Sequence, residues 1–106
     1  MKLPASVQIG HLRVTVSPMT DRGTSRKHAV GWYDDERAEI EVLDTLTPQI
    51  KAEILLHEML HCALAVANSG LDGEEEERVV SGLAPVLLMM MRDNPDVFAA
   101  LVEAMQ

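Results

Sequence analysis

Leu55-Leu56-His57-Glu58-Met59-Leu60-His61 is the stretch on which the interpretation of the whole chain depends. It contains the pattern His-Glu-x-x-His inside an apolar run. On an α-helix, residues four positions apart lie on one face, so His57 and His61 can bind the same metal ion. Burying two imidazoles and a carboxylate on an apolar helix is costly unless a partner compensates them. The pattern therefore predicts a helical metal site rather than two incidental histidines.

Glu58 follows the first histidine, and we expect it to lie beside the metal without binding it. Zinc with three protein ligands and one open position lowers the pKa of its water towards neutrality. A carboxylate at this place can accept the proton and later deliver it to a leaving amine. The motif is typical of metalloproteases, so it predicts zinc as cofactor, Glu58 as general base and a peptide or protein as substrate.

Size, charge and cysteine content limit the possible classes of protein. The chain has 106 residues, which fits one domain spanning residues 1–106, and its formal net charge is −8. Such a charge argues against binding to nucleic acid or to an anionic membrane surface. The single cysteine, Cys62, excludes an intramolecular disulfide, and the N-terminus lacks the apolar core of a signal peptide. We therefore predict a cytoplasmic protein, with Cys62 as a buried structural thiol.

The region before the motif, about residues 5–44, is predicted to form a small antiparallel sheet. Apolar and polar residues alternate from Val7 to Val16 with one interruption, which indicates two short strands or one strand with a bulge. Residues 17–27 are polar and are predicted to form a loop. Residues 29–33 and 38–43 are predicted to pair as a hairpin.

The region of about residues 47–106 is predicted to be helical. Thr47 followed by Pro48 combines a cap residue with proline at the first helical position. The motif helix should therefore run from about Pro48 to about Ala67, and Gly70 suits the left-handed conformation beyond its end. The predicted fold class is α+β, with the sheet packed on this helix.

A second helix is predicted from about Glu74, and a short third helix after Arg92-Asp93-Asn94-Pro95. From Leu83 to Met91 no residue is polar. Such a helix is buried on several sides, so this stretch is either a central core helix or a homodimer contact. Pro85 lies within it and should bend or split the helix.

Two histidines leave a zinc site one protein ligand short. The run from Glu74 to Glu77 lies one short loop beyond the motif helix, so one of its members is expected to reach the metal. Spacing from the apolar side of the second helix points both Glu76 and Glu77 towards the first helix and does not decide between them. The rest of the run is interpreted as a solvated first turn that suits the helix dipole.

The chain resembles the gluzincin-type zinc peptidases in a minimal form and, more closely, small phage- and prophage-encoded metallopeptidases. The resemblance covers roughly residues 30–96 and rests on four segments: Gly31-Trp32-Tyr33-Asp34, Leu55 to His61, Glu77-Arg78-Val79-Val80-Ser81-Gly82-Leu83-Ala84, and Arg92 to Pro95. It implies a small zincin-like fold with a glutamate-bearing helix after the motif helix. It also implies Glu77 as the third zinc ligand and the cytoplasm of a bacterial host as the location.

Contacts to a peptide substrate can be proposed from the same residues. Many peptidases use a further side chain to stabilise the oxyanion. The candidates here are Tyr33, His28 and Arg78. The strand at Glu39–Leu43 is expected to pair with an extended substrate by strand addition.

Two other functions stay open at this point. Zinc could act as a staple in a non-catalytic phage accessory module that binds a partner protein. Least favoured is a metal-free helical adaptor that uses the apolar face from Leu83 to Met91.

Overall fold

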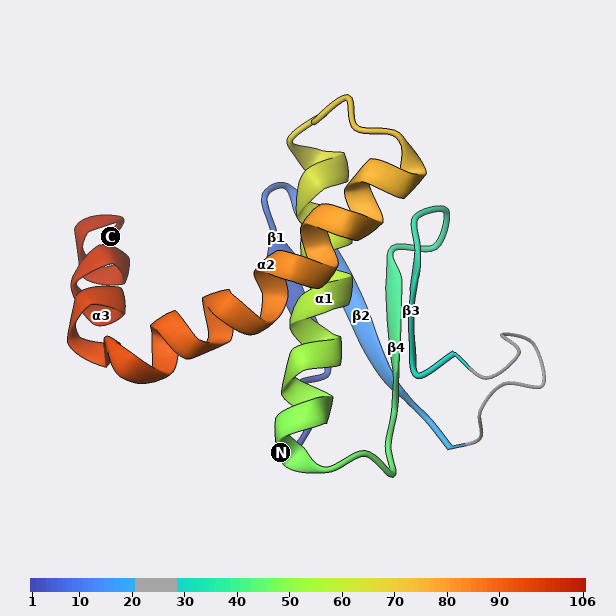
Figure 1. The fold of residues 1–106 in the computed structure, drawn as a ribbon, viewed down its shortest axis with the longest axis horizontal. Coiled ribbons are helices and arrows are strands. Elements are labelled where there is room, and N and C mark those ends of the chain that lie inside the picture. Colours follow the sequence, from blue (N-terminus) through green and yellow to red (C-terminus); the bar gives the residue numbers. More distant parts are fainter. Residues whose placement is uncertain (21–28) are drawn as a thin grey trace.

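Four strands and three helices make up the fold in the computed structural model, which describes residues 1–20 and 29–106 (Figure 1). In chain order they are β1 (Ser6–Ile9), β2 (Leu12–Met19), β3 (Gly31–Asp34), β4 (Glu39–Leu43), α1 (Pro48–Val66), α2 (Gly73–Asp93) and α3 (Pro95–Ala104). The protein is therefore of the α+β class, as predicted, with the strands first and the helices after them.

The strands form one sheet in the order β1-β2-β4-β3. β1 pairs with β2, and β3 with β4, as antiparallel neighbours, so the predicted hairpin of residues 29–33 and 38–43 is confirmed, and the first region forms two strands and not one with a bulge. β2 and β4 run parallel, with Thr15 opposite Glu39 and Met19 opposite Leu43. The predicted small sheet is thus largely antiparallel, with one parallel pair at its centre that local alternation did not indicate.

β2 is longer than predicted and continues to Met19. The loop prediction is therefore wrong for residues 17–19, while residues 21–28 lie outside the described part of the chain. Pro18 is tolerated in this strand because β1 ends its pairing at Thr15. Beyond that point β2 has a strand neighbour on only one side among the described strands, a position where the missing N–H of proline costs little.

The core lies between the sheet and α1. Val14, Val16, Ile40 and Val42 come from the two central strands, and α1 contributes Leu55 and Cys62. Val14, Ile40, Val42 and Cys62 have no exposed surface. Full burial of one aliphatic side chain contributes about 1.5–3 kcal/mol, so this layer holds the motif helix firmly against the sheet. The predictions of a sheet packed on α1 and of a buried Cys62 thiol are confirmed.

α1 begins and ends close to the predicted residues. Thr47 has the extended backbone of a cap residue and Pro48 occupies the first turn, although the Thr47 side chain makes no capping hydrogen bond. Beyond Val66 the chain turns through Asn68 and Gly70, whose φ angles are 55° and 76°. Gly70 therefore takes the predicted left-handed conformation. The turn leads directly into α2.

α2 begins at Gly73, where the Asp72 side chain accepts a 2.8 Å hydrogen bond from the Glu75 backbone N–H. The helix is continuous through Pro85, so of the two predicted effects of this residue, a bend or a split, the split is excluded. The core alternative for residues 83–91 is also wrong, because Ala84 is the only buried residue among them. Among the described residues, no helix combines the length and the apolar character that crossing a membrane requires.

Candidate metal centre

The packing of α2 on α1 brings three of the predicted ligands together. His57 and His61 lie one turn apart on α1, and Glu77 lies in the first turns of α2. One ligand atom from each of the three side chains lies within 4.8 Å of the others. The short connection between the helices places the start of α2 beside the C-terminal half of α1 (Figure 1). These residues are therefore close enough to hold a metal ion.

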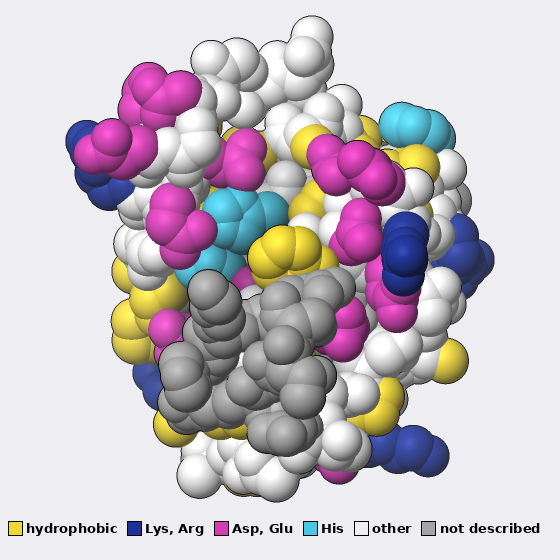
Figure 2. Space-filling view, turned by 90° about the vertical axis from the view of Figure 1, so that its right-hand side faces the viewer, with side chains coloured by type: hydrophobic (Ala, Val, Ile, Leu, Met, Phe, Trp, Pro, Cys, Tyr) yellow, Lys and Arg dark blue, Asp and Glu magenta, His cyan; other side chains and the backbone are white. Residues whose placement is uncertain are grey.

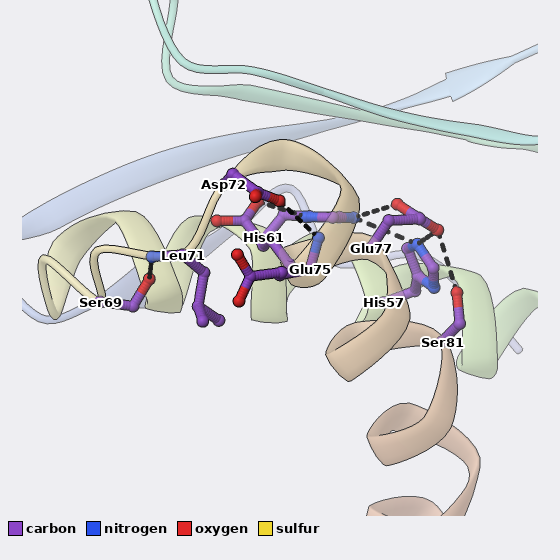
Figure 3. Close-up of polar contacts among 9 residues, drawn as sticks. His57, His61, Ser69, Leu71, Asp72, Glu75, Glu77 and Ser81 are labelled. Atoms are coloured by element: carbon purple, nitrogen blue, oxygen red, sulfur yellow. Dashed lines mark hydrogen bonds and ion pairs between the residues drawn. The ribbon is translucent and has the colours of Figure 1, made fainter.

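The carboxylate of Glu77 contacts both imidazole rings (Figure 3). Its Oε1 is 3.1 Å from His57 Nε2, and its Oε2 is 2.9 Å from His61 Nε2. The two Nε2 atoms are themselves 3.3 Å apart. Ser81, one turn further along α2, donates a 3.0 Å hydrogen bond to Glu77 Oε1 and orients the carboxylate.

In the neutral tautomer of His61 that Glu76 favours, two acceptor atoms face each other. His61 Nδ1 is 2.7 Å from Glu76 Oε2, so in a neutral ring the N–H is at Nδ1 and donates to Glu76. The lone pair of His61 Nε2 then points at Glu77 and at His57 Nε2. A lone pair and a carboxylate oxygen 2.9 Å apart repel each other, so this place suits a cation, either a proton on His61 Nε2 or a metal ion.

Glu76 and Glu77 divide two tasks that spacing alone left undecided. Glu77 faces the Nε2 atoms of both histidines, and Glu76 binds the far side of the His61 ring. A metal-binding histidine usually donates its other N–H to a carboxylate or carbonyl, which fixes the ring orientation and the tautomer. Sequence reasoning missed this role of Glu76 and also missed Ser81. The spacing of four residues between Glu77 and Ser81 was the available signal.

The charges around the two rings shift their pKa values in opposite directions. Burial lowers the pKa of His57. Burial also acts to lower the pKa of His61, but the hydrogen bond that the ring donates to Glu76 and the charges of Glu58 and Glu77 outweigh it, so that the pKa is raised. Burial acts to raise the pKa of Glu77, yet the Ser81 hydrogen bond and the two histidines lower it. Glu77 is thus held as an anion against both rings.

Glu58 has the burial and position expected of a proton acceptor. Its side chain is one of two charged side chains that are buried in the described residues, with 8% exposure, and it lines the cavity that also contains the histidines. Burial raises its pKa to about 7. A carboxyl group with this pKa can both accept and release a proton near neutral pH.

Gly31 allows β3 to approach Glu58 closely. A Cβ atom at this position would overlap the Ile54 side chain and would lie 3.1 Å from Glu58 Oε2. Only glycine has no side chain to clash here. The backbone of β3 therefore forms one wall of the site, directly opposite the motif helix.

A cavity of about 990 Å³ opens in front of these groups. Its walls are residues 29–36, which include β3, and the side chains of His57, Glu58, His61, Glu76 and Glu77. Figure 2 shows this face of the molecule, with imidazole rings near the middle and acidic side chains around them. The size and the convergent polar groups are those of a ligand site.

Of the three candidates for oxyanion stabilisation, the structure places only Tyr33 at the cavity among the residues that it describes. Tyr33 lines the cavity, and burial together with the neighbouring Cys62 thiol raises the pKa of its phenol, so that it stays protonated. Arg78 is exposed and is not among the residues that line the cavity. His28 lies outside the described residues.

The prediction that a substrate pairs with the strand Glu39–Leu43 is wrong. β4 lies between β2 and β3, so its backbone is already used within the sheet and cannot pair with a peptide. β3 is the strand at the edge of the sheet beside the cavity. The error arose because the sequence indicated the hairpin but not which of its two strands joins β2.

Comparisons of the chain with protein-family models, with curated proteins and with solved structures find no match. The resemblance to small phage-encoded metallopeptidases therefore remains a prediction from the sequence segments. Any functional conclusion has to come from the geometry of the site.

Proposed function

We propose that this protein is a zinc-dependent peptidase. The observation that supports the proposal best is the juxtaposition, in one cavity, of a buried carboxyl group and a cluster of metal-ligand atoms. Glu58 is buried beside the His57–His61–Glu77 group, and the open side of the cavity is bounded by an edge strand. A metal staple without catalysis has no need of the additional buried carboxyl group.

The donor set fits zinc. Two imidazole nitrogens and one carboxylate oxygen are common zinc ligands, and three protein ligands leave a position open for catalysis. Bonds of about 2.0–2.1 Å in tetrahedral geometry place the ligand atoms about 3.3 Å from each other. The two Nε2 atoms are 3.3 Å apart. When bound, zinc supplies a Lewis acid that makes water a better nucleophile and polarises the substrate carbonyl.

Glu58 is the group that moves the proton in this proposal. It accepts a proton from the water that attacks the peptide carbonyl carbon, and the C–N bond then breaks. The same proton passes from Glu58 to the departing amine nitrogen, so that the residue returns to its ionised state. Without a metal ion, burial raises the pKa of this carboxyl group to about 7, so it takes up a proton more readily than an exposed glutamate does.

The substrate is proposed to lie extended along β3. This strand forms the edge of the sheet and lines the cavity opposite His57 and Glu58. Strand addition would fix the main chain of the peptide, and the half-exposed Trp32 offers an apolar contact for a substrate side chain. The proposal therefore favours unfolded or flexible segments over folded proteins as substrates.

The experiment that tests this function is the Glu58→Gln variant. It should retain one equivalent of zinc and lose at least about 100-fold in hydrolysis of an unfolded protein, because glutamine cannot accept the proton. Glu75→Gln is the matched control, since Glu75 lies in the same acidic run and its side chain is exposed. It should hydrolyse at the wild-type rate.

Equal hydrolysis by wild type and Glu58→Gln would contradict the catalytic assignment. Zinc binding without hydrolysis by either protein would favour the non-catalytic, metal-stabilised module instead. The zinc content of each preparation, measured by elemental analysis, separates these outcomes from simple loss of metal.

A further inference from the structure

The C-terminal part of the chain extends away from the sheet and α1. The last buried residue of α2 is Ala84, and α3 has no buried residue at all. Among the described elements, α3 contacts only α2, and Figure 1 shows it at the far end of α2 from the sheet. We call residues 85–104 the helical arm. A ten-residue helix without packing is marginal in water, so the arm needs a surface to pack on.

One side of α2 carries an exposed apolar seam. Val79, Leu83, Val86 and Met90 recur at intervals of four, three and four residues and are 41–47% exposed. This is the spacing of the a and d positions along which two helices pack. The residues that bury α2 against α1, Val80 and Ala84, lie on a different side. The seam is therefore available for a second helix.

The whole chain exposes more surface than a compact monomer of its mass would. The chain exposes 7148 Å², whereas a compact folded monomer of 11.7 kDa is expected to expose about 5,900 Å². The excess, roughly 1,200 Å², exceeds the ~800 Å² that each partner buries in a stable interface. The radius of gyration, 14.1 Å, is likewise larger than the about 13 Å expected for a compact chain of this length.

We propose that the seam and the helical arm form an antiparallel homodimer interface. No residue from Gly82 to Met91 is charged, although the net charge is −8, so two copies can approach here with the least repulsion. A parallel pairing would set the acidic turns Glu74–Glu77 of both copies side by side. An antiparallel pairing instead keeps the acidic turns of the two copies at opposite ends of the interface, and it also opposes the helix dipoles.

A second copy covers this surface better than a flat partner would. Apolar residues are exposed on the seam and also on α3, where Val97 and Leu101 are one turn apart and more than half exposed. Two arms packed about a two-fold axis would form a four-helix arrangement that covers both sets from several sides. The inference uses neither the metal nor Glu58, so it stands or falls separately from the proposed peptidase activity.

The test is the concentration dependence of the mass of the full-length protein, measured by analytical ultracentrifugation. Wild type should form a dimer with twice the 11.7 kDa mass. Val86→Glu and Met90→Glu each put a charge in the seam and should weaken dimerisation at least about tenfold. Ile50→Glu is the matched control, because Ile50 is 47% exposed on α1, outside the seam, and its variant should dimerise normally.

A wild-type chain that stays monomeric at high micromolar concentration overturns the proposal, because the arm must then be covered by something other than a second copy. A dimer that both seam variants leave intact also overturns it. Hydrogen exchange of the wild type gives a readout that does not depend on the variants. The amides of α2 and α3 should gain protection as the concentration rises, and unchanged protection contradicts the proposed interface.

Discussion

Glu76 and Glu77 are adjacent in the sequence and contact the two different nitrogens of one imidazole ring. Glu76 binds His61 Nδ1 at 2.7 Å, and Glu77 lies 2.9 Å from His61 Nε2. Two carboxylates of equal chemistry therefore have different tasks. Glu77 offers a ligand oxygen, whereas Glu76 fixes the tautomer that leaves Nε2 free to bind a cation. Glu58 differs from both, because it is buried and burial is the main cause of its raised pKa.

This division of tasks predicts the effect of removing Glu76. Glu76→Ala should lower zinc affinity about 10–100-fold, because His61 loses the partner that orients its ring. Glu76→Gln should have a smaller effect, because the amide oxygen still accepts the hydrogen bond. Competition with a chromogenic chelator measures the affinities.

Glu75→Ala is the control for that experiment, since it removes one negative charge from the same helical turn without touching His61. If it weakens zinc binding as much as Glu76→Ala does, general charge, not the contact to His61, explains the effect.

At the scale of the elements, the site depends on the close approach of β3 to α1. Gly31 is the point of contact, because any side chain there would meet Ile54 and Glu58. The core residues Leu55 and Cys62 pack α1 against the central strands of the sheet, so α1 cannot move away from β3. If a side chain were added at Gly31, β3 would have to shift, and the cavity wall that it forms would shift with it.

Gly31→Ala should therefore destabilise the protein by about 1–3 kcal/mol, the usual cost of overpacking a tightly filled site. Urea unfolding measures the free energy. The matched substitution is Gly82→Ala in α2, where an added Cβ meets no atom within 4 Å. It should stabilise the protein by about 0.5–1 kcal/mol, because alanine favours the helix. A neutral Gly31→Ala variant would show that β3 adjusts freely and that the wall is not rigid.

At the scale of the whole molecule, α2 connects two parts with different surroundings. Its first turns carry Glu76 and Glu77 into the metal centre, and its last turns carry the helical arm away from the sheet. Among the described elements, α2 contacts only α1 and α3. Its position is therefore set by the short connection after Gly70, by the packing of Val80 and Ala84, and by the groups around the histidines. A metal ion at this site would add a further tie between α1 and α2.

Local signals in the sequence predicted most of the elements and the side chains of the centre. The spacing of His57 and His61, the start at Pro48 and the turn at Gly70 each depend on neighbouring residues, and the structure places all of them as expected. The parallel β2–β4 pair depends on contacts between distant segments, which alternation within each strand cannot indicate. The choice between Glu76 and Glu77 likewise depends on how α2 lies on α1.

The apolar run from Leu83 to Met91 shows the same limit. Its composition predicts that the helix is covered, and the structure shows that the cover does not come from the described part of the same chain. Composition indicates that this apolar surface must be covered, but it does not indicate which part of the protein or which partner covers it.

The central claim is that His57, His61 and Glu77 bind one zinc ion, and anomalous scattering at the zinc absorption edge tests it most directly. Crystals of the zinc-loaded protein should show a single strong peak bonded to both Nε2 atoms and to the Glu77 carboxylate, at about 2.0–2.2 Å from each. A peak elsewhere, or zinc-loaded crystals without a peak between these three side chains, would contradict the account.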